Sequence, residues 1–345
     1  MNIQKLIRPN ILKLKPYASA RDEYKEFTAA LTFLDANENP FETGLNRYPD
    51  PQQVLLKTRL AEIKGCNYNQ LILGNGSDEI LDLIFRTFCE PEKENVILLP
   101  PTYGMYEVLA NLNNVEIIKV PLTTDFQPDI SSILEVINSQ SKILFLCSPN
   151  NPTANSIKKE SIEVLIENFK GIVVIDEAYI DFSEFESWVS RLDEFPNLIV
   201  IQTLSKAYGL AGVRLGLAIA SEEIITVLNS IKPPYNINQL TQETALKRLA
   251  NLDLVKNQIN VIKQERFRVI SEIKSIKIIH KIYPSDANFI LVKVDDANKR
   301  YQQLINQEIV VRNRNKEPLC ENCLRLTIGT PEENTKLLTV LKSLI

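Results

Sequence analysis

Short strand-like apolar runs recur along the first 200 residues of this chain, and each ends in a polar or glycine-rich turn. They cover residues 71–73, 96–99, 142–147, 172–175 and 198–201. Residues 80–88, 159–169 and 188–195 instead keep the apolar spacing of helices. Continuous apolar strands that alternate with helices are typical of parallel strands buried on both faces. The pattern therefore predicts an α/β fold with a mostly parallel central sheet flanked by helices.

The last third of the chain has a different pattern. After a proline break at Lys232-Pro233-Pro234-Tyr235, residues 239–274 have helical spacing. Strand-like and helical stretches then alternate, over residues 289–294, 300–306, 309–312 and 324–328. We therefore predict an N-terminal arm over residues 1–30 that packs with the small domain, a large domain over 31–232, and a smaller α+β domain over 233–345.

Composition narrows the class of protein. The chain has 345 residues, of which 44% are hydrophobic, and its formal net charge is −4. An acidic balance without a long basic run argues against a nucleic-acid or acidic-membrane partner. Residues 1–10 lack the apolar core of a signal peptide, and no apolar stretch approaches the ~20 residues that cross a bilayer. We expect a cytoplasmic protein.

Cysteine and histidine offer little chemistry. The five cysteines are scattered, although Cys320 and Cys323 form a C-x-x-C pair that alone could be half of a zinc site or a redox pair. No second pair or nearby histidine completes it. His280 is the single histidine, in a strand-like run. We predict no metal site and no disulfide framework.

Functional side chains follow three of the strand-like runs. Asn151, Asp176 and Lys206 come after the runs 142–147, 172–175 and 198–201, respectively. Carboxyl ends of parallel strands meet at one edge of a sheet, so we expect these side chains to share a crevice. A lysine that is desolvated or near other cations has a lowered pKa and can form a Schiff base with a phosphorylated aldehyde. Alone, Lys206 could equally be an exposed loop lysine.

A candidate phosphate site lies upstream, in the stretch Gly74-Asn75-Gly76-Ser77-Asp78-Glu79. It precedes the helical stretch 80–88, and Ser77 or Asp78 can cap that helix. Unpaired N–H groups at a helix start attract phosphate. It is not a Walker loop, and alone this stretch could be a simple helix cap.

Tyr103 follows the run 96–99, where its ring could stack on a flat ligand.

The motifs together resemble pyridoxal-phosphate (PLP) aminotransferases of fold type I. In finer detail they are similar to those of the histidinol-phosphate aminotransferase family. The matching motifs run from residue 16 to 330 and read PYASAR, LDANENP, RYPD, GNGSDEI, PPTYGMY, CSPNNPT, VIDEAYIDF, TLSKAYGLAGVRLG and CLRLTIGT. One departure is Ala154, where the family usually has glycine. A backbone with positive φ at this position would be strained by the alanine.

The resemblance implies a role for each matching residue. Lys206 would hold PLP as a Schiff base and then move a proton on the substrate. Asp176 would pair with the pyridine nitrogen and keep it protonated. The resemblance further implies that the ring is held by Tyr103, Asn151 and Tyr179, and the cofactor phosphate by Ser77, Asp78, Thr203, Ser205 and Arg214.

The resemblance also implies substrates and a partner. The reaction would exchange an amino group between histidinol phosphate and 2-oxoglutarate, giving imidazole-acetol phosphate and glutamate. Arg325 can bind a phosphate or a carboxylate through two parallel hydrogen bonds, and Arg312 could add a second contact to the phosphate. Tyr17 and Asn37 would line the same pocket. Tyr48 would reach the cofactor phosphate of the neighbouring subunit, so we expect a homodimer.

Three other functions stay open at this point. A threonine-phosphate decarboxylase or an aromatic-amino-acid aminotransferase would share the cofactor machinery and differ in pocket shape. A cofactor-binding regulator would need an appended DNA-binding segment, and we expect none in the roughly 30 residues before the large domain.

Overall fold

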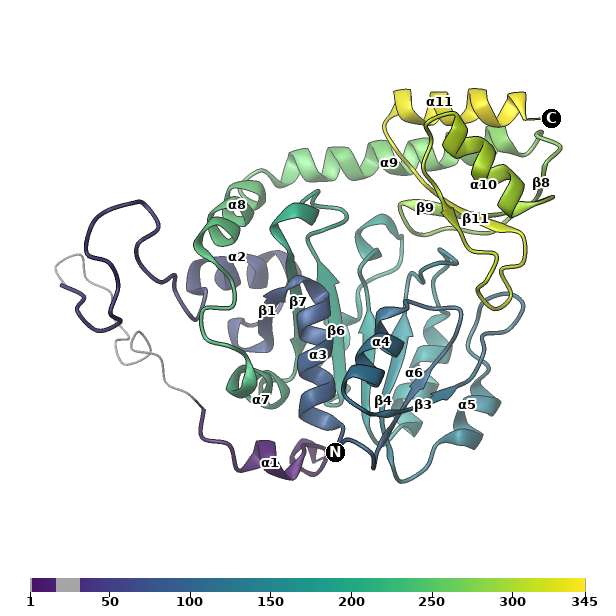
Figure 1. Ribbon diagram of the computed structural model, residues 1–345. Helices are drawn as coiled ribbons and strands as arrows, with labels where there is room; N and C mark the ends of the chain where they lie inside the picture. The colour runs from purple at the N-terminus through teal and green to yellow at the C-terminus, as the bar shows by residue number, and fades with distance from the viewer. Residues whose placement is uncertain (1, 17–31, 345) are drawn as a thin grey trace.

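The computed structural model describes residues 2–16 and 32–344. Its larger sheet has seven strands in the order β1-β7-β6-β5-β4-β2-β3 (Figure 1). In chain order the strands are β1 (Leu71–Asn75), β2 (Asn95–Leu98), β3 (Glu116–Lys119), β4 (Ser141–Cys147), β5 (Ile172–Asp176), β6 (Leu198–Thr203) and β7 (Leu215–Ala220). Only β7 runs against its neighbours, because it pairs antiparallel with both β1 and β6. The predicted mostly parallel sheet is confirmed.

The register of the parallel strands aligns their carboxyl ends. Cys147 at the end of β4 lies opposite Asp176 of β5, and Asp176 lies opposite Ile201 of β6. The loops that follow these three strands therefore leave the sheet side by side.

Both faces of the large sheet are buried. Leu144 and Leu146 of β4 belong to one apolar cluster, whereas Ile143 and Phe145 belong to the other. The alternation follows from the two-residue period of a strand. Burial of both faces explains why the sequence shows continuous apolar runs.

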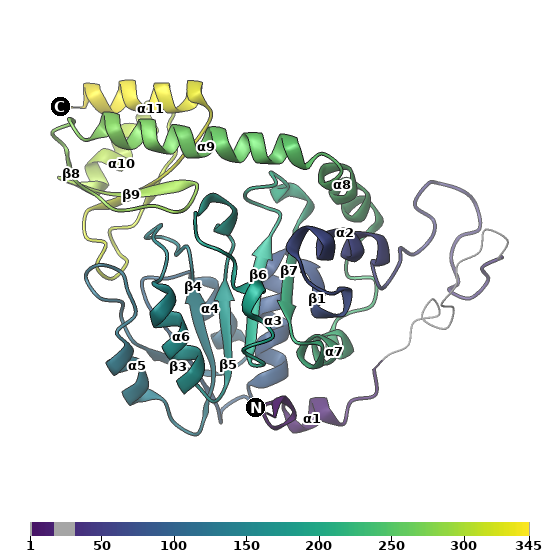
Figure 2. The ribbon, with the colours of Figure 1, turned by 180° about the vertical axis from the view of Figure 1, so that it is seen from behind.

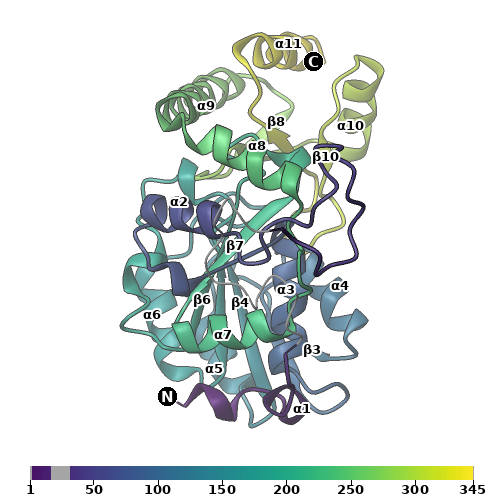
Figure 3. The same cartoon turned by 90° about the vertical axis from the view of Figure 1, so that its left-hand side faces the viewer.

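Helices cover the two faces in separate layers (Figures 2 and 3). One layer contains α3 (Gly76–Phe88), α4 (Met105–Leu112) and α7 (Glu222–Ile231). The other contains α2 (Val54–Lys64), α5 (Ile130–Val136), α6 (Lys159–Asn168) and α8 (Gln239–Leu249). Short 3-10 turns lie at η1 (Ile3–Lys5), η3 (Tyr68–Gln70), η4 (Ile180–Phe182), η5 (Trp188–Arg191) and η6 (Ala211–Val213).

The smaller sheet is antiparallel, in the order β10-β11-β9-β8. Its strands are β8 (Ile279–Ile282), β9 (Phe289–Val294), β10 (Arg312–Asn313) and β11 (Cys323–Thr327). Helices α10 (Ala297–Asn306) and α11 (Pro331–Ser343) pack on it. The long helix α9 (Leu252–Ile273) joins the two parts, because Val255 packs in the large cluster and Val269 in the small one. The expected fold-type-I architecture is confirmed.

The predicted domain boundary falls in the connection between α7 and α8. Ala245 and Leu249 of α8 belong to the same apolar cluster as the large sheet. Helix α8 thus follows the boundary in sequence but packs on the large layer. The division into residues 31–232 and 233–345 stays a prediction.

The N-terminal arm does not pack as expected. Ile3 and Ile7 are buried against the layer of α3 and α7, and the amide of Arg8 donates to the carbonyl of Thr87 at 2.9 Å. The short α1 (Pro9–Leu12) follows. For residues 2–16, the predicted packing with the small domain is therefore wrong. The two apolar side chains find their burial at the end of α3 instead.

Two predicted elements also differ in length. The helix predicted over 188–195 is only the 3-10 turn η5, because Pro196 follows closely and β6 already begins at Leu198. The helical stretch 239–274 is two helices. They are separated at Asn251, whose side chain accepts from the amide of Leu254 and caps α9.

Candidate active site

A cavity of about 260 Å³ lies where the carboxyl edge of the large sheet faces the small sheet. Its lining residues come from loops far apart in the sequence. The predicted residues that line it are Ser77, Asp78, Tyr103, Asn151, Asp176, Tyr179, Thr203, Ser205, Lys206, Arg214, Arg312 and Arg325. Cys147, Ala178 and Arg314 also line it. Asn151, Asp176 and Lys206 therefore share one crevice at the sheet edge, as the order of the strands predicted.

One end of the cavity is formed by the start of α3. The helix begins at Gly76, so Ser77 and Asp78 lie in its first turn, where backbone N–H groups have no partner within the helix. The predicted side-chain cap by Ser77 or Asp78 is wrong, since Asn75 holds the N-cap position without a side-chain bond. A first turn whose N–H groups have no partner within the helix is suited to an anion.

Two glycines allow Arg214 to approach this helix start. A Cβ on Gly76, whose φ is 73°, would lie 2.5 Å from Nη2 of Arg214. A Cβ on Gly216 would lie 2.3 Å from the amide nitrogen of Ser77. Arg214 itself has a positive φ of 55°, a backbone conformation that is costly for a non-glycine residue and often found at functional sites. The chain is built to hold a guanidinium beside free amides.

Hydroxyl groups and one carboxylate complete this end. The hydroxyl of Thr203 donates to Oγ of Ser205 at 3.0 Å. Asp78 accepts from the phenol of Tyr103 at 3.1 Å and lies 3.4 Å from Nη2 of Arg214. Burial, followed by the charge of Asp78, raises the pKa of Tyr103, so its phenol stays neutral. The donor set of amides, hydroxyls and an arginine fits the phosphate of PLP.

Asp176 lines the cavity from the terminus of β5. Its side chain is buried, and Oδ2 accepts from the phenol of Tyr106 at 2.7 Å while Oδ1 accepts from the amide of Ala178 at 3.1 Å. Both donors are neutral. Burial raises the pKa of Asp176, and the two hydrogen bonds oppose that rise. A buried carboxylate of this kind is stabilised by a cationic partner, such as a protonated ring nitrogen.

Lys206 lines the same cavity from the loop after β6. Its Nζ is 5.7 Å from the centre of the Tyr179 ring. Burial is the main cause that lowers its pKa, and the charge of Arg325 lowers it further. A lowered pKa increases the fraction of free amine, which is the nucleophilic form.

The small sheet contributes the arginines. Nη1 of Arg325 donates to Oδ1 of Asn151, which connects the small sheet to the loop after β4. Arg312 lies directly opposite Arg325 in the antiparallel pair of β10 and β11. Arg314 and Tyr106 also act on this site and were not predicted. Arg314 follows Arg312 by two residues, which is the spacing of side chains on one side of an extended segment, and Tyr106 follows Tyr103 by three residues, which is about one helical turn.

The remaining predicted residues are not brought into this cavity. Asn37 and Tyr48 line a separate cavity beside the start of α8, and the ring of Tyr48 stacks on Tyr235 at 4.6 Å. Within this single chain Asn37 does not reach the cavity, because residues 32–50 lie to one side of the two sheets (Figure 1), and its role in substrate binding stays a prediction. Tyr17 lies outside the described residues.

Ala154 has the predicted positive φ, at 72°. Its amide donates to the carbonyl of Asn150 and its carbonyl accepts from the amide of Asp286, so the conformation is fixed on both sides.

We expect Ala154→Gly to raise the free energy of unfolding by up to about 1 kcal/mol, because glycine adopts this φ without steric cost. Denaturant titration checks this. The matched control is Ala245→Gly inside α8, equally buried, which should lower the stability by about 1 kcal/mol. A loss in both variants would contradict the account.

Glu177 is a buried carboxyl group next to the site. It accepts from the amide of Trp188 at 2.7 Å, from Nε2 of Gln202 at 2.8 Å and from the hydroxyl of Ser187. Burial outweighs these bonds and raises its pKa from 4.5 to about 7. Between pH 4.5 and about 7, Glu177 is therefore mostly protonated in the folded protein and mostly ionised in the unfolded chain.

A pH dependence of stability follows from Glu177. Its contribution is complete below pH 4.5 and is lost as the pH rises to about 7. The stability of the wild type relative to Glu177→Gln should therefore fall by roughly 3 kcal/mol across that window. Gln is a fair substitute because the unpartnered Oε1 of Gln202 can turn to accept from the new amide. Paired unfolding titrations at several pH values measure this, and a constant difference would contradict it.

Other sites are limited in the described part of the chain. Within residues 2–16 and 32–344, no group of three His, Cys, Asp or Glu side chains is placed to hold a metal ion. Cys320 and Cys323 are free and buried. Over the same residues, each helix is too short or too polar to cross a membrane.

Comparison with known proteins gives a consistent set of matches. The family model of aminotransferase class I and II matches residues 27–341. A histidinol-phosphate aminotransferase of Christiangramia forsetii is 59% identical over 343 residues, covering 99% of this chain and 98% of the relative. One of Flavobacterium psychrophilum is 60% identical over 346 residues, covering 99% of each chain. The crystal structure of the histidinol-phosphate aminotransferase from Clostridium acetobutylicum superposes with a TM-score of 0.80 at 26% identity, covering 87% of this chain and 91% of that one.

Proposed function

This chain belongs to the aminotransferase class I and II family, and on that premise we propose that it exchanges an amino group between L-histidinol phosphate and 2-oxoglutarate. The products are imidazole-acetol phosphate and L-glutamate, in a reversible step of histidine biosynthesis. The observation that carries the proposal is the single cavity in which Lys206, Asp176 and Arg214 meet Arg312 and Arg325. Relatives of that name at 59% identity along the whole chain support it.

The cavity residues fit PLP. When bound, this cofactor supplies an aldehyde that condenses with amines and a ring that withdraws electrons. Its phosphate would be held by the first turn of α3, Ser205 and Arg214, with Thr203 supporting Ser205. Its ring would be held by Tyr103, Asn151 and Tyr179, and its nitrogen by Asp176. Each of these assignments is a proposal that uses the donors and charges described above.

The chain's own residues account for the remaining requirements of the reaction. Lys206, as a free amine with a lowered pKa, takes the proton from the substrate carbon that bears the amino group and can return it. Asp176 would pair with the ring nitrogen of the cofactor, and a proton on that nitrogen would favour the ionised form of the carboxyl group. Arg325 binds the anionic group of either substrate, and the hydrogen bond that it donates to Asn151 orients its guanidinium group.

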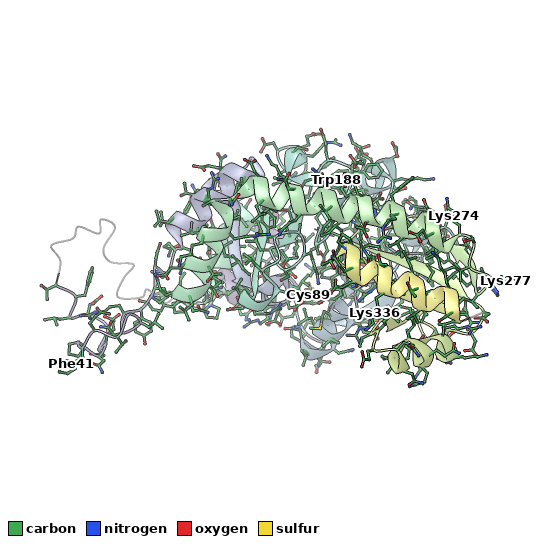
Figure 4. The ribbon with its side chains drawn as sticks, turned by 90° about the horizontal axis from the view of Figure 1, so that it is seen from above. Phe41, Cys89, Trp188, Lys274, Lys277 and Lys336 are labelled. Carbon is green, nitrogen blue, oxygen red and sulfur yellow. The ribbon has the colours of Figure 1, made fainter. Side chains whose placement is uncertain are left out.

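We also propose that the site is completed in a homodimer. Apolar side chains on the segment 32–50 are unusually exposed, with Leu34 at 87% and Phe41 at 78%. Figure 4 shows Phe41 at the tip of this segment, away from the body. A second copy would cover these side chains and bring Tyr48 and Asn37 toward the partner's cavity. The cytoplasmic location stays a prediction.

A half-reaction with purified, PLP-loaded protein tests the proposed function. Histidinol phosphate should convert the cofactor rapidly to its amino form, which is seen as a shift of the near-ultraviolet absorption band. 2-Oxoglutarate should restore the original band. A much faster response to phenylalanine would favour the aromatic-amino-acid aminotransferase, and release of CO₂ from threonine phosphate would favour the decarboxylase.

A further inference from the structure

Three arginines share one side of the short ribbon that closes the cavity. Arg312 lies opposite Arg325 in the pairing of β10 with β11, and Arg314 follows two residues later. Residues two apart on an extended segment point to the same side. All three side chains line the cavity. Like charges placed opposite each other are unfavourable, so this arrangement needs a reason.

The protein itself offers these guanidinium groups little compensation. Arg325 is bonded to a neutral amide, that of Asn151. Arg314 has one carboxylate nearby, Glu317, at 3.4 Å, and that carboxylate is partly exposed. The Nε groups of Arg314 and Arg325 are both buried and have no hydrogen-bond partner among the described residues. Buried donors beside a cavity indicate a missing acceptor.

The positive charges also act on one another. Burial has the largest effect in lowering the pKa of Arg325, and the positive charges of Arg314 and Arg312 lower that pKa further. Arg325 and Arg314 in turn oppose the rise in the pKa of Tyr179 that burial causes. Arg314 is therefore electrostatically coupled both to the arginine that binds substrate and to the proposed ring-binding tyrosine. An anion in the cavity would relieve this repulsion.

Arg314 is held on an ordered turn. Its amide donates to the carbonyl of Cys323 at 2.9 Å. The amide of Asn315 donates to Oδ1 of Asn313 at 2.9 Å, and the amide of Asn322 donates to Oδ1 of Asn315 at 2.7 Å. This bracing fixes the backbone of Arg314 before a ligand arrives. Because the backbone is already ordered, less conformational entropy is lost when the side chain of Arg314 binds a ligand.

We propose that Arg314 is a specificity-determining residue that, with Arg312, binds the second negative charge of a phosphate monoester, so that the site prefers a phosphate to a carboxylate. One guanidinium can satisfy the two oxygens and single charge of a carboxylate. A phosphate dianion has three terminal oxygens and about twice the charge of a carboxylate. Two further arginines can therefore bind the remaining oxygen and the second negative charge. The identity of the phosphate substrate rests on the proposed function, but the charge argument does not.

The first test compares Arg314→Gln with the wild type in separate half-reactions. With histidinol phosphate, kcat/KM should fall about 10- to 100-fold, mainly through KM, because a charge-assisted contact made throughout binding is lost. With glutamate, kcat/KM should stay within about 3-fold. The matched control is Arg86→Gln at the exposed end of α3, which should change neither value. An equal loss with both substrates, or no loss, would overturn the proposal.

A binding measurement separates this proposal from the proposed function. Inorganic phosphate is titrated into PLP-loaded protein, in which the cofactor already fills the site at α3, and acetate is titrated as the carboxylate control. Arg314→Gln should weaken phosphate binding about 10-fold and leave acetate unchanged. Unchanged phosphate binding, or none in the wild type, would overturn the proposal even if histidinol phosphate reacts. A wild type that binds phosphate through Arg314 but fails to transaminate histidinol phosphate would refute only the proposed function.

Arg314→Lys guards against a folding defect in the glutamine variant. Lysine keeps the charge but loses the planar fork, so phosphate affinity should lie between those of the wild type and Arg314→Gln. Thermal melting of all three proteins checks that they fold alike. A lysine variant no better than glutamine, in a protein that melts normally, would show that charge is not what Arg314 contributes.

Discussion

Lys206→Ala is expected to lower turnover by roughly 10⁴-fold or more while leaving the protein folded and able to bind PLP without a covalent bond. The amine lines the same cavity as Asp176, and its pKa is lowered by burial and by the charge of Arg325. Removing it takes away both the nucleophile and the group that moves the substrate proton. The phosphate end is formed by other residues, so affinity for the cofactor should survive.

The measurement is turnover together with the absorption spectrum of cofactor-loaded protein. Lys119→Ala is the matched control, because Lys119 is exposed and pairs with Glu107 on the surface. It should behave as wild type. Near-normal turnover in Lys206→Ala would remove the mechanism.

Asp176→Asn is expected to lower turnover by roughly 10³-fold with little change in stability. The amide has the shape of the carboxylate but lacks the charge that would keep a ring nitrogen protonated. Its two neighbours can adapt, since the Tyr106 hydroxyl can accept from the new NH₂ group while Oδ1 still accepts from the amide of Ala178.

Tyr106→Phe provides a graded comparison. It removes the 2.7 Å hydrogen bond that opposes the raised pKa of Asp176, but leaves the carboxyl group in place. Its loss of turnover should be much smaller than that of Asp176→Asn. If the phenylalanine variant were the more impaired of the two, Asp176 would not be the group that acts on the cofactor.

The sequence was most informative where the chain is buried on both faces. Asp176 and Lys206 could be placed at one sheet edge because a continuous apolar run precedes each of them, and such runs mark parallel interior strands. The same reasoning did not reveal β7, although Leu215–Ala220 is apolar, because nothing in a short run tells whether it is parallel or antiparallel. Yet β7 places Gly216 against the start of α3, so it shapes the phosphate end of the cavity.

Other features depend on contacts that no local pattern encodes. The cross-strand pairing of Arg312 with Arg325 sets the side on which Arg314 lies, and pairing between segments 13 residues apart is set by the sheet register. The N-terminal residues pack against α3 and not against the small sheet, because the side chains of Ile3 and Ile7 are buried there. Asn37 and Tyr48 lie away from the cavity within one chain, so the roles predicted for them would need a second copy.

The most direct test of the central claim is borohydride reduction of PLP-loaded protein followed by peptide mass spectrometry, with and without prior addition of histidinol phosphate. The account predicts that reduction attaches the cofactor to Lys206 and to no other lysine. It also predicts that histidinol phosphate, added first, strongly reduces this labelling because the substrate amine displaces the lysine. Labelling elsewhere, or labelling of Lys206 that histidinol phosphate does not change, would contradict it.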